Sequence, residues 1–97
     1  MSQVITHVQG TVEPDRVTEV RAQYEAALAP GLPPGLMETF LAQSEPGHIA
    51  IISIWASQGD LDTMIASGQE PLARRLIREA GGLPELTVLT VIATSRS

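Results

Sequence analysis

The chain has no cysteine and no lysine, and only 3% of its 97 residues are aromatic. Without cysteine there can be no disulfide, no thiolate metal site and no thiol nucleophile. The two histidines, His7 and His48, stand too far apart in the sequence for a histidine-based metal motif. Net charge is −5, so the clustered positive charge that binds nucleic acid is missing. Neither a metal nor a nucleic-acid partner is therefore expected.

Long hydrophobic runs are also missing. The longest apolar stretch, residues 49–57, is far shorter than the roughly 20 residues that a membrane span needs. Met1-Ser2-Gln3 places no basic segment before an apolar run, so no signal peptide is expected. We expect a cytoplasmic protein with no membrane partner. A chain of this length predicts a single domain, residues 1–97.

The most informative stretch is Ile49–Ser57, where seven of nine residues are apolar. Its apolar residues fall on both alternating faces, which is typical of a strand that is covered on both sides. It contains Trp55, the single tryptophan, and is predicted to end at Ser57. A helix is expected to follow, with Asp60 as its N-cap.

The rest of the chain predicts an α+β fold. Val4–Val12 alternates as a strand does, and Val17, Val20, Tyr24, Ala27 and Leu28 form one helical stripe. The proline-rich residues 30–35 are read as a linker. Further elements are predicted as a strand at 36–43, a hairpin turn at 44–48, a helix from residue 60 that is interrupted at 67–71 and resumes at 72–80, and a strand at 85–94. This order is β-α-β-β-α-β, the ferredoxin-like pattern with a four-stranded antiparallel sheet.

A homodimer is expected from the same pattern. Two helices can cover only one face of such a sheet, yet strands 49–57 and 85–94 are apolar on both faces. The simplest cover for the open face is the same face of a second copy, which would give a dimeric α+β barrel.

In the hairpin Leu36–Trp55, the strand end Ile54–Ser57, the helix entry Asp60-Leu61 and the break Ser67–Pro71, the chain resembles the antibiotic biosynthesis monooxygenase family. The likeness spans Val4–Ala93 and implies a pocket between the sheet and the helices. Oxygenase members of that family oxidise aromatic, polyketide-like substrates with dioxygen, without metal or flavin. The resemblance therefore implies a small aromatic or hydrophobic ligand and no cofactor.

The chain departs from the family pattern in two places. Many members carry an acidic residue where Ser53 stands here. A heme-degrading branch uses asparagine, tryptophan and histidine at positions that match His7, Met64 and Arg74, so heme degradation is disfavoured.

The site candidates follow from the implied pocket. His7 is the candidate catalytic residue, because an imidazole can accept a phenolic proton near neutral pH; the alternative is a histidine on the sheet surface or at the dimer seam. The candidate substrate-binding residues are Tyr24, Phe40, Trp55 and Met64. For each of them an ordinary role in the core is the simpler alternative.

Three arginines of the second helical region could bind an anion. However, Glu70–Arg74 and Arg75–Glu79 have the i,i+4 spacing of ion pairs on a solvated helix face, which we take as the simpler interpretation.

Two functions are open at this point. One is a cofactor-independent monooxygenase that acts on an aromatic or quinol-type molecule. The other is a non-catalytic dimeric barrel that binds a small hydrophobic ligand.

Overall fold

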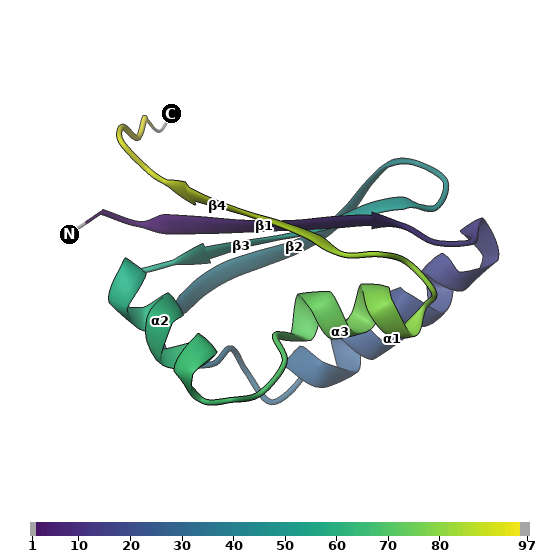
Figure 1. Ribbon diagram of the computed structural model, residues 1–97, viewed down its shortest axis with the longest axis horizontal. Coiled ribbons are helices and arrows are strands. Elements are labelled where there is room, and N and C mark those ends of the chain that lie inside the picture. The colour runs from purple at the N-terminus through teal and green to yellow at the C-terminus, as the bar shows by residue number, and fades with distance from the viewer. Residues whose placement is uncertain (1, 96–97) are drawn as a thin grey trace.

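The computed structural model describes residues 2–95 and confirms an α+β fold with the ferredoxin-like element order (Figure 1). The second predicted helix is divided into two, and a short 3₁₀ helix precedes the first. The elements are β1 (Val4–Thr11), η1 (Pro14–Arg16), α1 (Val17–Leu28), β2 (Leu36–Glu45), β3 (His48–Trp55), α2 (Gln58–Ala66), α3 (Leu72–Glu79) and β4 (Glu85–Thr90).

The four strands form one antiparallel sheet in the order β2-β3-β1-β4. β2 and β3 are joined by a two-residue turn, Pro46-Gly47. Gly47 has φ +86°, and a Cβ at this position would lie 2.4 Å from the Val12 carbonyl oxygen. Glycine is therefore needed here, both for the left-handed backbone and because the turn passes close to the backbone of Val12. Because the turn uses only two residues, β2 continues to Glu45 instead of ending at Gln43 as predicted.

The predicted end of the central strand and the predicted helix cap are wrong. β3 ends at Trp55, because the Ser57 side chain caps α2 by accepting a hydrogen bond of 3.2 Å from the Asp60 N–H. Ser57 is thus the N-cap, and Asp60 lies in the first turn, where its carboxylate accepts a 2.9 Å bond from the Ser57 hydroxyl. The bond from the Asp60 N–H to the Ser57 hydroxyl is one half of a capping box, whereas the Asp60 carboxylate bonds to the Ser57 hydroxyl and not to its backbone N–H.

The last strand is also shorter than predicted. β4 ends at Thr90 instead of Thr94, and Thr90 pairs with Val4, the first residue of β1. The Val91 N–H still bonds to the Gln3 carbonyl at 2.9 Å, but beyond this point β4 has run past the start of its only partner strand. A strand cannot extend beyond the neighbour that supplies its ladder of hydrogen bonds.

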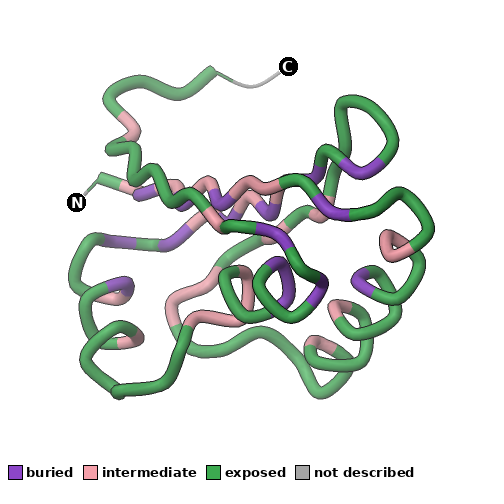
Figure 2. The backbone as a smooth tube through the Cα atoms, turned by 45° about the vertical axis from the view of Figure 1, so that its right-hand side comes forward, coloured by how far each residue is buried: buried purple, intermediate pink, exposed green. Residues whose placement is uncertain are grey.

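All three α-helices lie on one face of the sheet, with α1 and α3 over one half and α2 over the other (Figure 1). Figure 2 shows that buried residues gather where these helices meet the sheet. The larger core joins α1 and α3 to the sheet through Val8, Val12, Val20, Ile49, Ile51, Leu76, Ile77 and Ala80. The smaller core, under α2, consists of Val4, Trp55 and Leu61. The space between these two cores becomes the candidate site.

The opposite face of the sheet has no helix over it in the part of the chain that the structure describes. Strand register places on this face Ile5, His7, Phe40, Ile52, Ile54 and Leu89. Phe40 and Leu89 are 44% and 49% exposed.

Between residues 2 and 95, no helix has both the length and the hydropathy to cross a membrane.

Candidate functional site

A pocket of about 610 Å³ lies on the helix-covered face of the sheet, between α2 on one side and α1 and α3 on the other. This volume is in the range of small-molecule sites. Most of the wall is aliphatic: Val8 and Ile51 come from the sheet, Leu61 from α2 and Leu72 from α3. The predicted pocket between sheet and helices is therefore present.

The proline-rich stretch is part of this wall. Residues 30–33 line the pocket between the end of α1 and the start of β2, so they do more than link two elements. Their backbone leaves the helix at Ala29 and cannot re-enter one, because proline has no N–H and excludes the helical ladder. Side chains of Pro30 and Pro33 thereby form an apolar rim of low conformational entropy.

Hydroxyl groups form a row across the pocket floor. Thr39, Ser53 and Thr6 are register neighbours on β2, β3 and β1, and all three line the pocket. Thr39 Oγ1 and Ser53 Oγ are 3.1 Å apart, and the Tyr24 hydroxyl on α1 donates to Thr39 Oγ1 at 3.3 Å. These short polar side chains leave space above the sheet and offer hydrogen bonds to a ligand.

Trp55 is both a core residue and a pocket residue. Its side chain is buried, and its indole N–H donates a hydrogen bond of 3.1 Å to Thr6 Oγ1. Since this donor is already used within the chain, the indole offers a ligand its aromatic surface rather than its N–H. Met64 packs against the same cluster and supplies a polarizable side chain to the pocket.

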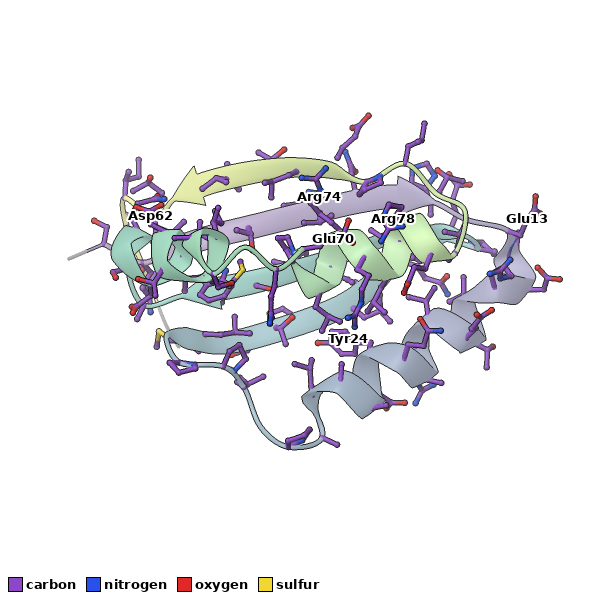
Figure 3. All side chains as sticks on the ribbon, turned by 60° about the horizontal axis from the view of Figure 1, so that its bottom comes forward. Glu13, Tyr24, Asp62, Glu70, Arg74 and Arg78 are labelled. Carbon is purple, nitrogen blue, oxygen red and sulfur yellow. The ribbon has the colours of Figure 1, made fainter. Side chains whose placement is uncertain are left out.

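Three of the five predicted site residues come together, namely Tyr24, Trp55 and Met64 (Tyr24 is labelled in Figure 3). The other two, His7 and Phe40, do not line the pocket. Both pair with Ile52 across the strands, so they lie in one row on the opposite face of the sheet. The expectation that His7 acts in the pocket does not match this placement, whereas the alternative, the sheet surface, does. The reason is the strict alternation of side chains along β1, which points Thr6 and His7 to opposite faces.

Ionisable side chains are rare among the described residues that line the pocket: these are Tyr24 and Arg74. No histidine or carboxylate belongs to this lining, and residues 2–95 contain no cluster of three or more His, Asp or Glu side chains able to hold a metal ion. The arrangement can enclose an apolar molecule, hydrogen-bond to it from the floor and meet it with one positive charge.

The predicted ion pairs on α3 are half right. Arg75 lies 3.8 Å from Glu79, as expected, but Glu70 pairs with Arg78 instead of Arg74. Two hydrogen bonds, of 2.9 and 2.6 Å, join the Arg78 guanidinium to the Glu70 carboxylate. They lower the pKa of Glu70 from its usual 4.5 and raise the pKa of Arg78. Glu70 lies in the segment before α3, and Arg78 lies in the last turn of that helix, so the pair joins residues eight positions apart in the sequence.

Sequence reasoning missed the hydroxyl row, and it took Arg74, one of the three arginines considered for an anion, as part of a solvated helix face. A signal for the row was available: Ser53 interrupts the apolar run of β3 two residues before Trp55, on the same face, and Thr6 stands between Val4 and Val8 on one face of β1. Both prove to be buried, at 8% exposure each. Buried hydroxyls in apolar strands indicate either internal hydrogen bonds or a site, and here they provide both.

Solved structures share this fold. A mutant form of SnoaB, described as a cofactor-independent oxygenase from Streptomyces nogalater, is 22% identical over 97% of both chains, with a TM-score of 0.71. Rv0793 from Mycobacterium tuberculosis is 21% identical over 98% of this chain and 100% of its own, with a TM-score of 0.70. A candidate antibiotic biosynthesis monooxygenase from Caulobacter crescentus is 18% identical over 95% and 92%, with a TM-score of 0.67.

No protein-family model matches the chain, and no curated protein matches it in sequence. At these identities the structural likeness establishes the fold. The fold that the sequence resemblance implied is thereby confirmed, since structures named as antibiotic biosynthesis monooxygenases share it across nearly their whole length.

Proposed function

We propose that this chain is a member of the antibiotic biosynthesis monooxygenase family, that it binds a small aromatic or quinol-type molecule in the pocket, and that it oxidises this molecule with dioxygen. One observation carries the proposal: the 610 Å³ pocket combines aliphatic and aromatic walls with a floor of hydroxyl groups. Such a site suits a flat apolar ring system with an oxygen substituent. The relation to SnoaB, described as a cofactor-independent oxygenase, supports the type of reaction.

The chemistry follows from the substrate class. An activated ring methylene that loses two hydrogens and gains a carbonyl oxygen supplies four electrons. These reduce dioxygen, whose second oxygen leaves as water, so the reaction balances without an external reductant. Within the chain, Thr39 and Ser53 would hold the substrate oxygen, Trp55 and Met64 would contact the ring, and the Tyr24 hydroxyl would exchange the proton.

A second function, ligand binding without turnover, is favoured by a specific feature of the pocket. Its described lining contains neither histidine nor carboxylate, the side chains that most often abstract protons near neutral pH. His7, the predicted proton acceptor, points to the other side of the sheet. In this case the same walls and floor would bind a hydrophobic molecule for transport or delivery.

We also propose a homodimer in which the open sheet faces of two single-domain subunits pack together. The support is the mostly apolar open face, on which Phe40 and His7 flank Ile52 and Leu89 lies beside Ile5. Exposed apolar surfaces of this kind commonly mark interaction sites. His7 and Phe40 would then lie at the dimer seam.

The test combines oxygen uptake with binding. A panel of anthrones and naphthols is offered to wild type, and binding is followed through the fluorescence of Trp55, the single tryptophan. Uptake together with binding supports the oxygenase. Binding without uptake supports the second function, and the absence of both contradicts each of them.

Variants locate the site. Tyr24→Phe and Ser53→Ala are expected to lower affinity or uptake several-fold, because each removes a hydroxyl from the floor. Ser44→Ala, at an exposed position of β2, is the matched control. Loss of uptake in His7→Ala together with full uptake in Tyr24→Phe would contradict a reaction in this pocket.

A further inference from the structure

Arg74 brings a positive charge to a pocket whose other described lining residues carry none. It stands in the first turn of α3, directly after Leu72 and Ala73, which also line the pocket. Its side chain is exposed, whereas Thr6, Ser53 and Trp55 on the floor are buried. Arg74 therefore belongs to the exposed rim of the pocket and not to its buried floor.

Arg75 and Arg78, the other arginines of α3, are in ion pairs with carboxylates, whereas Arg74 is in none among residues 2–95. Arg75 lies 3.8 Å from Glu79. Arg78 binds Glu70 through two hydrogen bonds, and both residues are labelled in Figure 3. Glu70 lies four residues before Arg74, but both of its carboxylate oxygens already accept hydrogen bonds from Arg78. Among residues 2–95, the Arg74 side chain has neither a hydrogen bond nor an ion pair. Its five N–H donors are available to a ligand.

We propose that Arg74 makes the pocket selective for aromatic ligands that carry an anionic group, a carboxylate or phenolate, at the edge facing the rim. This inference rests on the proposed function, since it assumes that the pocket binds an aromatic molecule. The planar guanidinium matches a carboxylate with two parallel hydrogen bonds. Aliphatic walls next to it exclude part of the water and so strengthen the attraction.

The negative net charge of the chain makes Arg74 more important for binding an anion. The chain carries −5, so its average field repels an anion, and only a local positive charge can reverse the preference. Because the Arg74 side chain is exposed, water screens it and the gain is modest. We expect about a three- to tenfold preference for an anionic ligand over its neutral isostere, in the range of a partly exposed charge-assisted bond.

The test compares 2-naphthoate with 2-naphthamide, which have the same ring and nearly the same shape. Affinities are measured through Trp55 fluorescence for wild type, Arg74→Gln, Arg74→Lys and the control Arg75→Gln. Wild type and Arg75→Gln should prefer the naphthoate, and the preference should shrink as salt rises. Arg74→Gln should lose the preference for the naphthoate and favour the neutral naphthamide, because the negative field of the chain is then unopposed at the pocket. Arg74→Lys should retain part of the preference for the naphthoate.

The outcomes separate the two proposals. If wild type binds both compounds without preference, or if Arg74→Gln keeps the preference, the selectivity is overturned while ligand binding in the pocket stands. If wild type binds neither compound, the assignment of an aromatic-binding pocket fails, and the role of Arg74 fails with it. Melting curves of each variant without ligand show whether a lost preference reflects lost folding.

Discussion

The indole N–H of Trp55 on β3 donates a hydrogen bond of 3.1 Å to Thr6 Oγ1 on β1, and the two residues are only 4% and 8% exposed. The residues are diagonal neighbours across the strands, because Val4 pairs with Trp55 and Thr6 pairs with Ser53. The bond therefore joins the small core under α2 to the hydroxyl row of the pocket floor. It orients the indole ring that a ligand would contact.

Replacing Thr6 with valine should destabilise the fold by about 1–3 kcal/mol, because the buried indole N–H would lose its acceptor while the side-chain volume hardly changes. Chemical denaturation measures the effect. Thr11→Val, at an exposed position of the same strand, should change stability by less than about 0.5 kcal/mol. Equal losses in the two variants would show that the hydrogen bond is not the cause.

Alanine at Gly10 should be poorly tolerated. A Cβ there would lie 2.6 Å from Cγ2 of Ile77, which is fully buried, and 3.2 Å from the Leu83 carbonyl oxygen. We expect a loss of about 1–3 kcal/mol, since α3 must shift to make room. Gly59→Ala in α2, where the nearest atom is Ser57 Oγ at 3.6 Å, is the control and should be neutral or stabilising by up to about 1 kcal/mol. Thermal melts that rank the two variants in the opposite order would contradict the packing of α3 on β1.

The proposed dimer predicts that Leu89→Arg yields a monomer. Leu89 is 49% exposed on the open sheet face, so the substitution costs little within one chain but places two charges at the interface of a dimer. Sedimentation or light scattering should show a dimer for wild type and a monomer for the variant. Leu83→Arg, at an 85% exposed loop position, should leave the dimer intact. A monomeric wild type at micromolar concentration would exclude the proposed assembly.

Removing the Glu70 carboxylate should lower stability at neutral pH but not in acid. Because Arg78 depresses the folded-state pKa of Glu70 below 4.5, the pair stabilises the fold above that value, and the contribution disappears as pH falls through the lowered pKa. Melting temperatures of wild type and Glu70→Gln should therefore differ slightly at pH 7 and converge in acid. Glu13→Gln, at an exposed position that has no ion pair among residues 2–95, controls for the loss of one surface charge. A difference that grows as the pH falls would contradict the pairing.

Much of the fold could be predicted because its signals are local. The alternation in Val4–Val12 predicts a strand, and the apolar stripe around Val20 predicts a helix. The Pro46-Gly47 pair predicts the turn. In each case the residues themselves indicate the backbone geometry. The residues at which strands and helices end are harder to predict than the elements themselves. The apolar run predicts a strand as far as Ser57, yet Ser57 caps α2. The same serine can extend a strand or cap a helix, and the outcome depends on whether the Asp60 N–H lies within reach of its hydroxyl.

The sequence by itself therefore determined the order and type of the elements and the two-sided apolar character of the central strands, because periodicity along one strand or helix is set by its own geometry. Only the tertiary structure decided which face of the sheet the helices cover, and with it that Thr6 and Ser53 lie in the pocket while His7 and Phe40 lie outside. Likewise, only the folded chain showed that Glu70 reaches Arg78 and leaves Arg74 at the pocket rim. Both faces of an apolar strand look alike in sequence, and a long side chain has several partners within reach, so these choices depend on packing between distant segments.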